Sequence, residues 1–131
     1  MKKAKKARRV EEKTVYVLVQ KGRVALRRRG SGGLLAGLWE FPNVPGKLEE
    51  SHAPAPLEKW GLVPKQWHES LTAKHIFTHV EWHMTGYVLE VEGRGPEEVL
   101  WVDAKGLAAH AVPSAFGKFY AEAQRALAKE D

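Results

Sequence analysis

Two apolar stretches separated by a Lys-Gly pair constrain the fold of this chain most strongly. Residues 14–20 (TVYVLVQ) are rich in β-branched and aromatic side chains, a composition that favours a strand. Residues 23–28 alternate apolar Val24 and Leu26 with charged neighbours, which is typical of a strand with one face in water. Because Lys21-Gly22 between them is a tight-turn signal, we predict a β-hairpin over residues 14–28.

The segment after this hairpin predicts a loop and a short helix. Residues 34–41 are unusually apolar for a loop, and the prolines within residues 42–46 predict a turn. Pro54 and Pro56 precede LEKW, and Gly61 follows it. Proline at the start and glycine after the end are expected to bracket a short helix.

The second half of the chain favours strands and ends in a helix. Two strand-like stretches lie within residues 70–91, clearest over 72–77 and 81–91, and residues 99–102 form a short buried-type strand. Asp103 can cap a following short helix, and Pro113 opens a last one. Its buried stripe is expected to contain Phe116, Phe119, Tyr120, Ala123 and Leu127. The pattern predicts an α+β domain, a mixed sheet with helices on its faces.

Length and cysteine content limit the class of protein. A chain of 131 residues can bury one core and is too short for two ordinary domains. The absence of cysteine excludes disulfides, a thiol nucleophile and a cysteine-held zinc or iron–sulfur cluster in this chain, and fits a cytosolic protein. No stretch of eighteen apolar residues is present, and the basic start lacks the apolar run of a secretory signal, so we expect no membrane association.

The net charge of +5 belongs to the first thirteen residues. They hold seven cations and two carboxylates, which leaves fourteen of each sign in the rest of the chain. Such a charge block predicts a disordered linker over residues 1–13. It can equally act as an arm that neutralises DNA phosphates, and both roles can hold at once. The candidate phosphate contacts are Lys2, Lys3, Lys5, Lys6, Arg8 and Arg9.

The sequence carries no hydrolase elbow, Walker motif or dinucleotide-binding glycine pattern. Ser31 lies among glycines, which favours a flexible turn. His75, His79 and His83 recur every four residues, a spacing that would suggest zinc on a helix. On one strand, however, neighbours would stand about 13 Å apart, so we favour no metal site. Glu40 has no acidic partner beside it, and we interpret it as a structural polar contact.

Several segments resemble the C-terminal domain of MutY-family adenine DNA glycosylases. GGLLAGLWEFPN (residues 32–43) resembles the family's LLxxLWEFP segment, and HIFTH (residues 75–79) resembles its F-S-H loop. Residues 80–84 and 111–116 are similar to the next strand and to the entry of the closing helix. The resemblance covers about residues 14–125 and implies a Nudix-like three-layer α/β/α sandwich over residues 14–131, with residues 1–13 as an interdomain linker.

The resemblance implies that the domain reads 8-oxoguanine opposite misincorporated adenine in double-stranded DNA. Oxidation turns guanine N7 into an N–H donor, which a hydroxyl can accept. The family uses the serine of its F-S-H loop for this contact, and Thr78 stands at that position here, keeping the hydroxyl and adding a methyl group. Phe77 would brace the loop against the base or the core, and His79 would hold the loop or contact the DNA backbone.

In this family, the catalytic carboxylates and an iron–sulfur cluster belong to a separate N-terminal domain. We therefore expect a monomeric, cytoplasmic, nucleoid-associated recognition domain with no catalytic site and no cofactor of its own, partnered by that catalytic domain. The chain is then either a piece of a longer glycosylase or a natural stand-alone domain. Its lysine-rich start, similar to the family's linker, favours a piece.

Two other classes of function compete with this interpretation. Nudix pyrophosphohydrolases hold magnesium with several glutamates on one helix, in the box G-x5-E-x7-R-E-U-x-E-E-x-G-U. Aligned on Gly61, this chain keeps only Glu58 of the three glutamates on that helix, with Lys59 beside it. The third class is a protein-interaction module using residues 34–39 if they are exposed, although we expect those residues to pack in the core.

Overall fold

The computed structural model of the chain describes residues 7–129. Its elements run in the order β1 (Arg9–Gln20), β2 (Arg23–Arg28), β3 (Trp39–Glu40), β4 (Asn43–Pro45), α1 (Pro54–Lys59), β5 (Val63–Ile76), β6 (Val80–Glu92), β7 (Val99–Val102), α2 (Ala104–Ala109), the 3₁₀ turn η1 (Ser114–Phe116) and α3 (Gly117–Lys129).

Within the described residues the strands form one seven-stranded mixed sheet of order β3-β2-β1-β6-β5, with β4 paired to β1 and β7 to β2. β1 and β6 are parallel over eleven registered pairs, from Arg9↔Val80 to Val19↔Glu90, and the other pairs are antiparallel. The parallel pair is the centre of the molecule, and β5 forms an open edge beside it.

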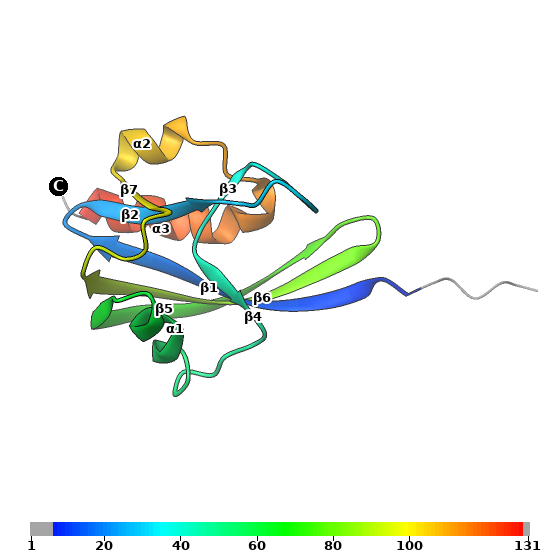
Figure 1. The fold of residues 1–131 in the computed structure, drawn as a ribbon, viewed down its shortest axis with the longest axis horizontal. Coiled ribbons are helices and arrows are strands. Elements are labelled where there is room, and N and C mark those ends of the chain that lie inside the picture. Colours follow the sequence, from blue (N-terminus) through cyan, green and yellow to red (C-terminus); the bar gives the residue numbers. More distant parts are fainter. Residues whose placement is uncertain (1–6, 130–131) are drawn as a thin grey trace, which may run out of the picture.

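Helices cover both faces of the sheet, α2 and α3 on one and α1 on the other (Figure 1). Each face buries its own core. Phe116, Phe119, Ala123 and Leu127 pack on one side, and Leu57 of α1 packs with Tyr16 and Leu89 on the other. This arrangement confirms the predicted three-layer α/β/α sandwich with a mixed sheet.

The predicted hairpin is confirmed, but its first strand is longer than the sequence indicates. Lys21 and Gly22 both have positive φ, 49° and 74°, as a two-residue turn between twisted strands requires. β1 begins at Arg9, so the prediction of a disordered linker over residues 1–13 is wrong from Arg9 on. These charged residues are strand because the partner β6 continues alongside them, supplying backbone hydrogen bonds that composition cannot reveal. Residues 1–6 lie outside the described residues.

Two further boundaries differ from prediction. β5 begins at Val63, although the sequence indicated a strand only from about residue 70, because its first half is an exposed polar edge without apolar alternation. Within the predicted loop and turn over residues 34–46, the chain forms the short strands β3 and β4. They are held by pairing to β2 and β1 rather than by their own propensity.

The three predicted helices are confirmed. α1 ends at Lys59 and is followed by Gly61 with φ of 73°. The Asp103 carboxylate accepts the Gly106 N–H at 2.8 Å and caps α2. Pro113 precedes η1 and α3, whose predicted stripe is buried except for the half-buried Tyr120. Among residues 7–129, no helix is long and apolar enough to cross a membrane.

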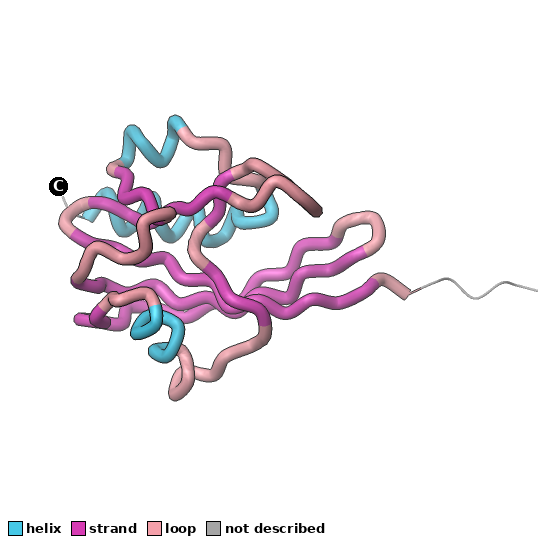
Figure 2. Tube along the Cα trace, in the orientation of Figure 1, coloured by secondary structure: helices cyan, strands magenta, loops and turns pink. Residues whose placement is uncertain are grey.

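One end of the sheet extends beyond the helices. The β5–β6 hairpin and the start of β1 project together on the right of Figure 1, and Figure 2 shows this extension ending in a short loop. The loop is residues 77–79, the segment that sequence analysis selected as the candidate recognition site.

Candidate nucleic-acid interface

The hairpin tip Phe77-Thr78-His79 presents two exposed polar residues on a fixed backbone. The Phe77 N–H donates to the Val80 carbonyl at 2.8 Å, which closes the hairpin. The Arg9 N–H donates to the His79 carbonyl at 3.1 Å and so fastens the tip to β1. Thr78 and His79 are exposed, so their side chains are available to a ligand while their backbone is anchored on two sides.

Phe77 braces the tip from behind by packing into the core. It is half-buried, its ring centroid lies 4.9 Å from that of Trp82 at 68°, and it packs edge-on against His75 at 4.6 Å. Trp82 is 1% exposed and continues the contact to Phe116. The structure shows the contact of Phe77 with the core, and a contact with a base stays a prediction.

Two cations lie over the Trp82 ring. The Lys13 Nζ is 4.6 Å from its centroid and the Arg29 Cζ is 5.1 Å from it. Burial, and next the positive charge of Arg29, lower the pKa of Lys13 below its usual value. The sequence does not reveal this cluster, because Lys13 falls within the basic segment over residues 1–13. The signal that could have found it is the position of Lys13 beside Thr14, directly adjoining the predicted strand.

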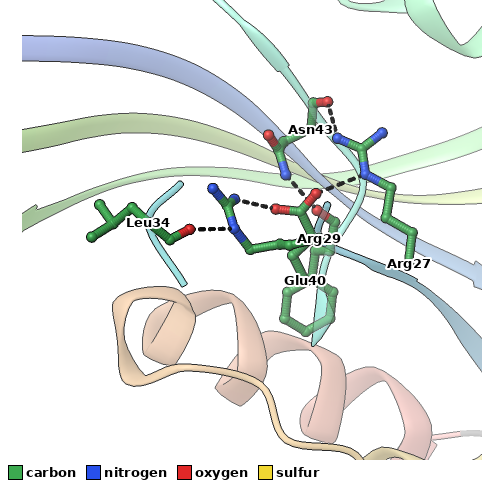
Figure 3. Close-up of polar contacts among 6 residues, drawn as sticks. Arg27, Arg29, Leu34, Glu40 and Asn43 are labelled. Atoms are coloured by element: carbon green, nitrogen blue, oxygen red, sulfur yellow. Dashed lines mark hydrogen bonds and ion pairs between the residues drawn. The ribbon is translucent and has the colours of Figure 1, made fainter. Parts of the chain in front are cut away.

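Glu40 joins two arginines, one of which is Arg29 of this cluster (Figure 3). It is 4% exposed and accepts from the Arg27 Nε at 2.8 Å and from the Arg29 Nη1 at 2.6 Å. Arg27 also donates to the Asn43 carbonyl at 2.7 Å, and Arg29 to the Leu34 carbonyl at 3.1 Å. The prediction that Glu40 makes a structural polar contact is confirmed, since it ties β2 and β3 to the loop over residues 30–38.

The apolar segment over residues 34–39 is only partly buried. Leu35 and Trp39 pack against the core, and Trp39 also packs edge-on against His110 at 4.7 Å. Leu34 is 39% exposed. The expectation of core packing therefore holds for Leu35 and Trp39 and not for Leu34. Ser31, in the same loop, is exposed.

The three histidines do not share one strand. His75 is on β5, His79 is in the tip and His83 is on β6, because the hairpin reverses between them. The His83 Nε2 lies 3.0 Å from a Glu81 carboxylate oxygen. Within residues 7–129, no group of three or more His, Asp or Glu side chains is arranged to hold a metal ion, and the chain has no cysteine for an iron–sulfur cluster.

The arginines at the start of β1 are paired with carboxylates. Arg8 contacts Glu81 at 3.1 Å, and Arg9 contacts Glu11 at 2.8 Å. A hydrogen bond from His83 and then one from Arg8 lower the pKa of Glu81. Of the candidate phosphate contacts, Lys2, Lys3, Lys5 and Lys6 lie outside the described residues.

The face that carries α1 shows one helical glutamate. Glu58 and Lys59 are exposed, while Leu57 is buried. Glu49 and Glu50 are exposed in the loop before α1. That loop is fixed to the sheet by the Tyr87 hydroxyl, which donates to the Leu48 carbonyl at 2.7 Å.

Comparison with known proteins identifies the family. A family model described as NUDIX domain matches residues 14–122. The chain belongs to the NUDIX domain family. At 18% identity, this NUDIX domain also shares its fold with the MutT protein of Methanosarcina mazei Go1, with a TM-score of 0.66 over 90% of this chain and 95% of that one.

Two relatives place this NUDIX domain in the MutY C-terminal type. Human adenine DNA glycosylase is 33% identical over 105 residues, which cover 72% of this chain and 19% of the human enzyme. The chain thus spans about a fifth of that relative. The C-terminal domain of mouse MUTYH, solved in complex with human PCNA, is 27% identical, with a TM-score of 0.65 over 88% of this chain and 89% of that one. The resemblance found in the sequence is therefore confirmed.

Proposed function

We propose that this NUDIX domain recognises 8-oxoguanine opposite adenine in duplex DNA, as the lesion-reading domain of an adenine DNA glycosylase. The similarity to adenine DNA glycosylase supports the repair context. The observation that carries the proposal is the hairpin tip, where the exposed Thr78 stands on a backbone fixed by Val80 and Arg9 and braced by Phe77 against Trp82. Excision of adenine would then belong to another domain.

An exposed hydroxyl beside an anchored backbone fits the chemistry of the lesion. The Thr78 oxygen can accept from the N7–H that 8-oxoguanine gains. A hydroxyl can also donate to the N7 of ordinary guanine, so one net hydrogen bond is the upper limit of the preference from this contact. A net hydrogen bond of about 1 kcal/mol corresponds to roughly a five-fold difference in affinity.

The test compares Thr78→Val with Thr78→Ser. Valine keeps the branched shape and removes the hydroxyl, whereas serine keeps the hydroxyl and removes the methyl group. We expect Thr78→Val to reduce the preference for the 8-oxoguanine:adenine duplex over the guanine:adenine duplex by up to about five-fold, and Thr78→Ser to retain it. An unchanged preference ratio in the valine variant would remove Thr78 from the recognition contact.

A magnesium-dependent pyrophosphohydrolase is the alternative, and α1 argues against it. Hydrolysis of a nucleoside di- or triphosphate in this family needs several carboxylates around the metal, and α1 offers only Glu58 with Lys59 beside it. We expect no magnesium-dependent release of phosphate or pyrophosphate from nucleoside triphosphates. Turnover that disappears in Glu58→Gln would favour the alternative.

A further inference from the structure

A groove of about 460 Å³ opens beside the β5–β6 hairpin. It gathers cations from three separate segments: Lys74 from β5, Lys47 from the loop after β4, and Lys118 from the start of α3. Glu12 is the one carboxylate among the described residues that line it. The groove therefore carries a net positive charge, although the domain beyond its first thirteen residues is neutral.

The lysines of this groove are free to bind an anion. Among residues 7–129, none of the three makes an ion pair with a carboxylate, in contrast to Arg8 and Arg9. Within the described part of the chain, their one hydrogen bond is donated by the Lys118 Nζ to the Thr72 carbonyl at 3.2 Å. Three lysines against the single carboxylate of Glu12 among the described lining residues favour an anionic ligand, because an anion offsets the excess positive charge.

The rest of the lining suits phosphate oxygens rather than bases. Thr72 and Thr85 face each other across β5 and β6, and Lys74 is likewise paired with His83. Hydroxyl and ammonium groups are usual donors to backbone phosphates. Of the described lining residues none is Phe, Tyr or Trp, so the groove lacks a surface on which a base would stack.

The groove also lies at a suitable distance from the tip. Lys74 precedes Thr78 by four positions in the chain, or about 13 Å at the rise of a strand. Duplex DNA rises about 3.4 Å per base pair, so the same distance spans roughly four base pairs. One duplex can therefore contact the tip and the groove together.

We propose that this groove binds the phosphate backbone of the same duplex whose lesion the tip reads. The inference rests on the proposed function. On this proposal the tip distinguishes damaged from intact guanine. The groove supplies affinity for DNA that is independent of sequence and sensitive to salt.

The experiment compares two double variants with the same change in charge. Lys74→Gln/Lys118→Gln removes two groove cations. Lys21→Gln/Lys105→Gln removes two cations that line a different cavity, beside α2 and α3. Affinity for duplexes with and without 8-oxoguanine is measured from about 50 to about 200 mM salt, because binding through phosphates weakens steeply over that range. Lys74→Gln alone, at an exposed site, serves if removal of the Lys118 ammonium impairs folding.

Log affinity falls with log salt, and we expect this fall to be less steep in the groove variant. The magnitude of the slope should decrease by about 1.8, at about 0.9 for each phosphate that is no longer neutralised. Its preference for the damaged duplex should stay unchanged, and the control variant should keep the wild-type slope.

Equal slopes in the two double variants would overturn the proposal that the groove binds phosphates, even if lesion preference persists. A reduced slope with no lesion preference in any variant would instead overturn the proposed function and retain the groove. Inorganic pyrophosphate that competes as effectively as DNA would overturn the backbone assignment in favour of a small phosphorylated ligand.

Discussion

Replacing Gly86 by alanine should destabilise the domain without touching the tip. Gly86 lies in the middle of β6, where a Cβ atom would stand 2.1 Å from the Phe119 Cε1 and 2.9 Å from its Cδ1. Ordinary contact begins near 3.4 Å, so the ring would have to retreat by about 1.3 Å. Phe119 is fully buried between α3 and the sheet, which leaves it little room to move. We expect overpacking to cost about 2–3 kcal/mol, near the upper end of such substitutions.

Thermal and denaturant unfolding measure this effect. For a domain of this size, such a loss corresponds to a fall in Tm of roughly 6–15 °C. Gly117→Ala is the matched control, because a Cβ there meets nothing within 4 Å and Gly117 is helical, with φ of −53°. That substitution should leave stability unchanged or raise it by up to about 1 kcal/mol. Equal stability of Gly86→Ala and the wild-type protein would refute the close packing of α3 on β6.

Three further outcomes follow from the charged clusters. Glu40→Gln leaves two partly buried arginines without their counter-charge. The free energy of unfolding in urea should fall by about 2–3 kcal/mol, somewhat less than when a fully buried ion pair is broken. A fall below about 0.5 kcal/mol would contradict the structural role given to Glu40. Lys13→Met should maintain or raise the stability of the domain at pH 7, because the lowered pKa of Lys13 means that its charged form is disfavoured in the fold. A clear loss of stability would contradict this and show that the charge over Trp82 is a net stabilising contact. Glu81→Gln should be less stable than the wild-type protein at pH 7, and the difference in stability should shrink as the pH falls below about 4.5. The reason is that a carboxyl group with a lowered pKa adds stability only while it is ionised. The same difference in stability at pH 7 and pH 3 would rule out the ion pair with Arg8 and the contact with His83 as the source of the difference.

The elements that were predicted correctly from the sequence are those whose signals lie within a few neighbouring residues. The turn at Lys21-Gly22, the cap at Asp103 and the stripe of the last helix each depend on residues a few positions apart, and each was predicted from the sequence. The start of β1 at Arg9 and the strands β3 and β4 were missed, because they are strands through pairing with other segments and not through their own composition. Pairing of that kind overrides local composition.

The candidate site divides in the same way. The tip Phe77-Thr78-His79 was located by its resemblance to a family loop, and the structure supplies what the motif does not state, namely the packing of Phe77 on Trp82. The groove cations could not be found by pattern, because Lys47, Lys74 and Lys118 are far apart in the sequence and meet only when the sheet and α3 assemble.

We propose that this domain by itself distinguishes a damaged guanine from an intact one. The direct test is the ratio of the dissociation constants of the 131-residue protein for two duplexes that differ only in 8-oxoguanine or guanine opposite adenine. We expect weak, salt-sensitive binding to both, with roughly five-fold tighter binding of the damaged duplex. A ratio of one at every salt concentration would contradict lesion recognition by this domain.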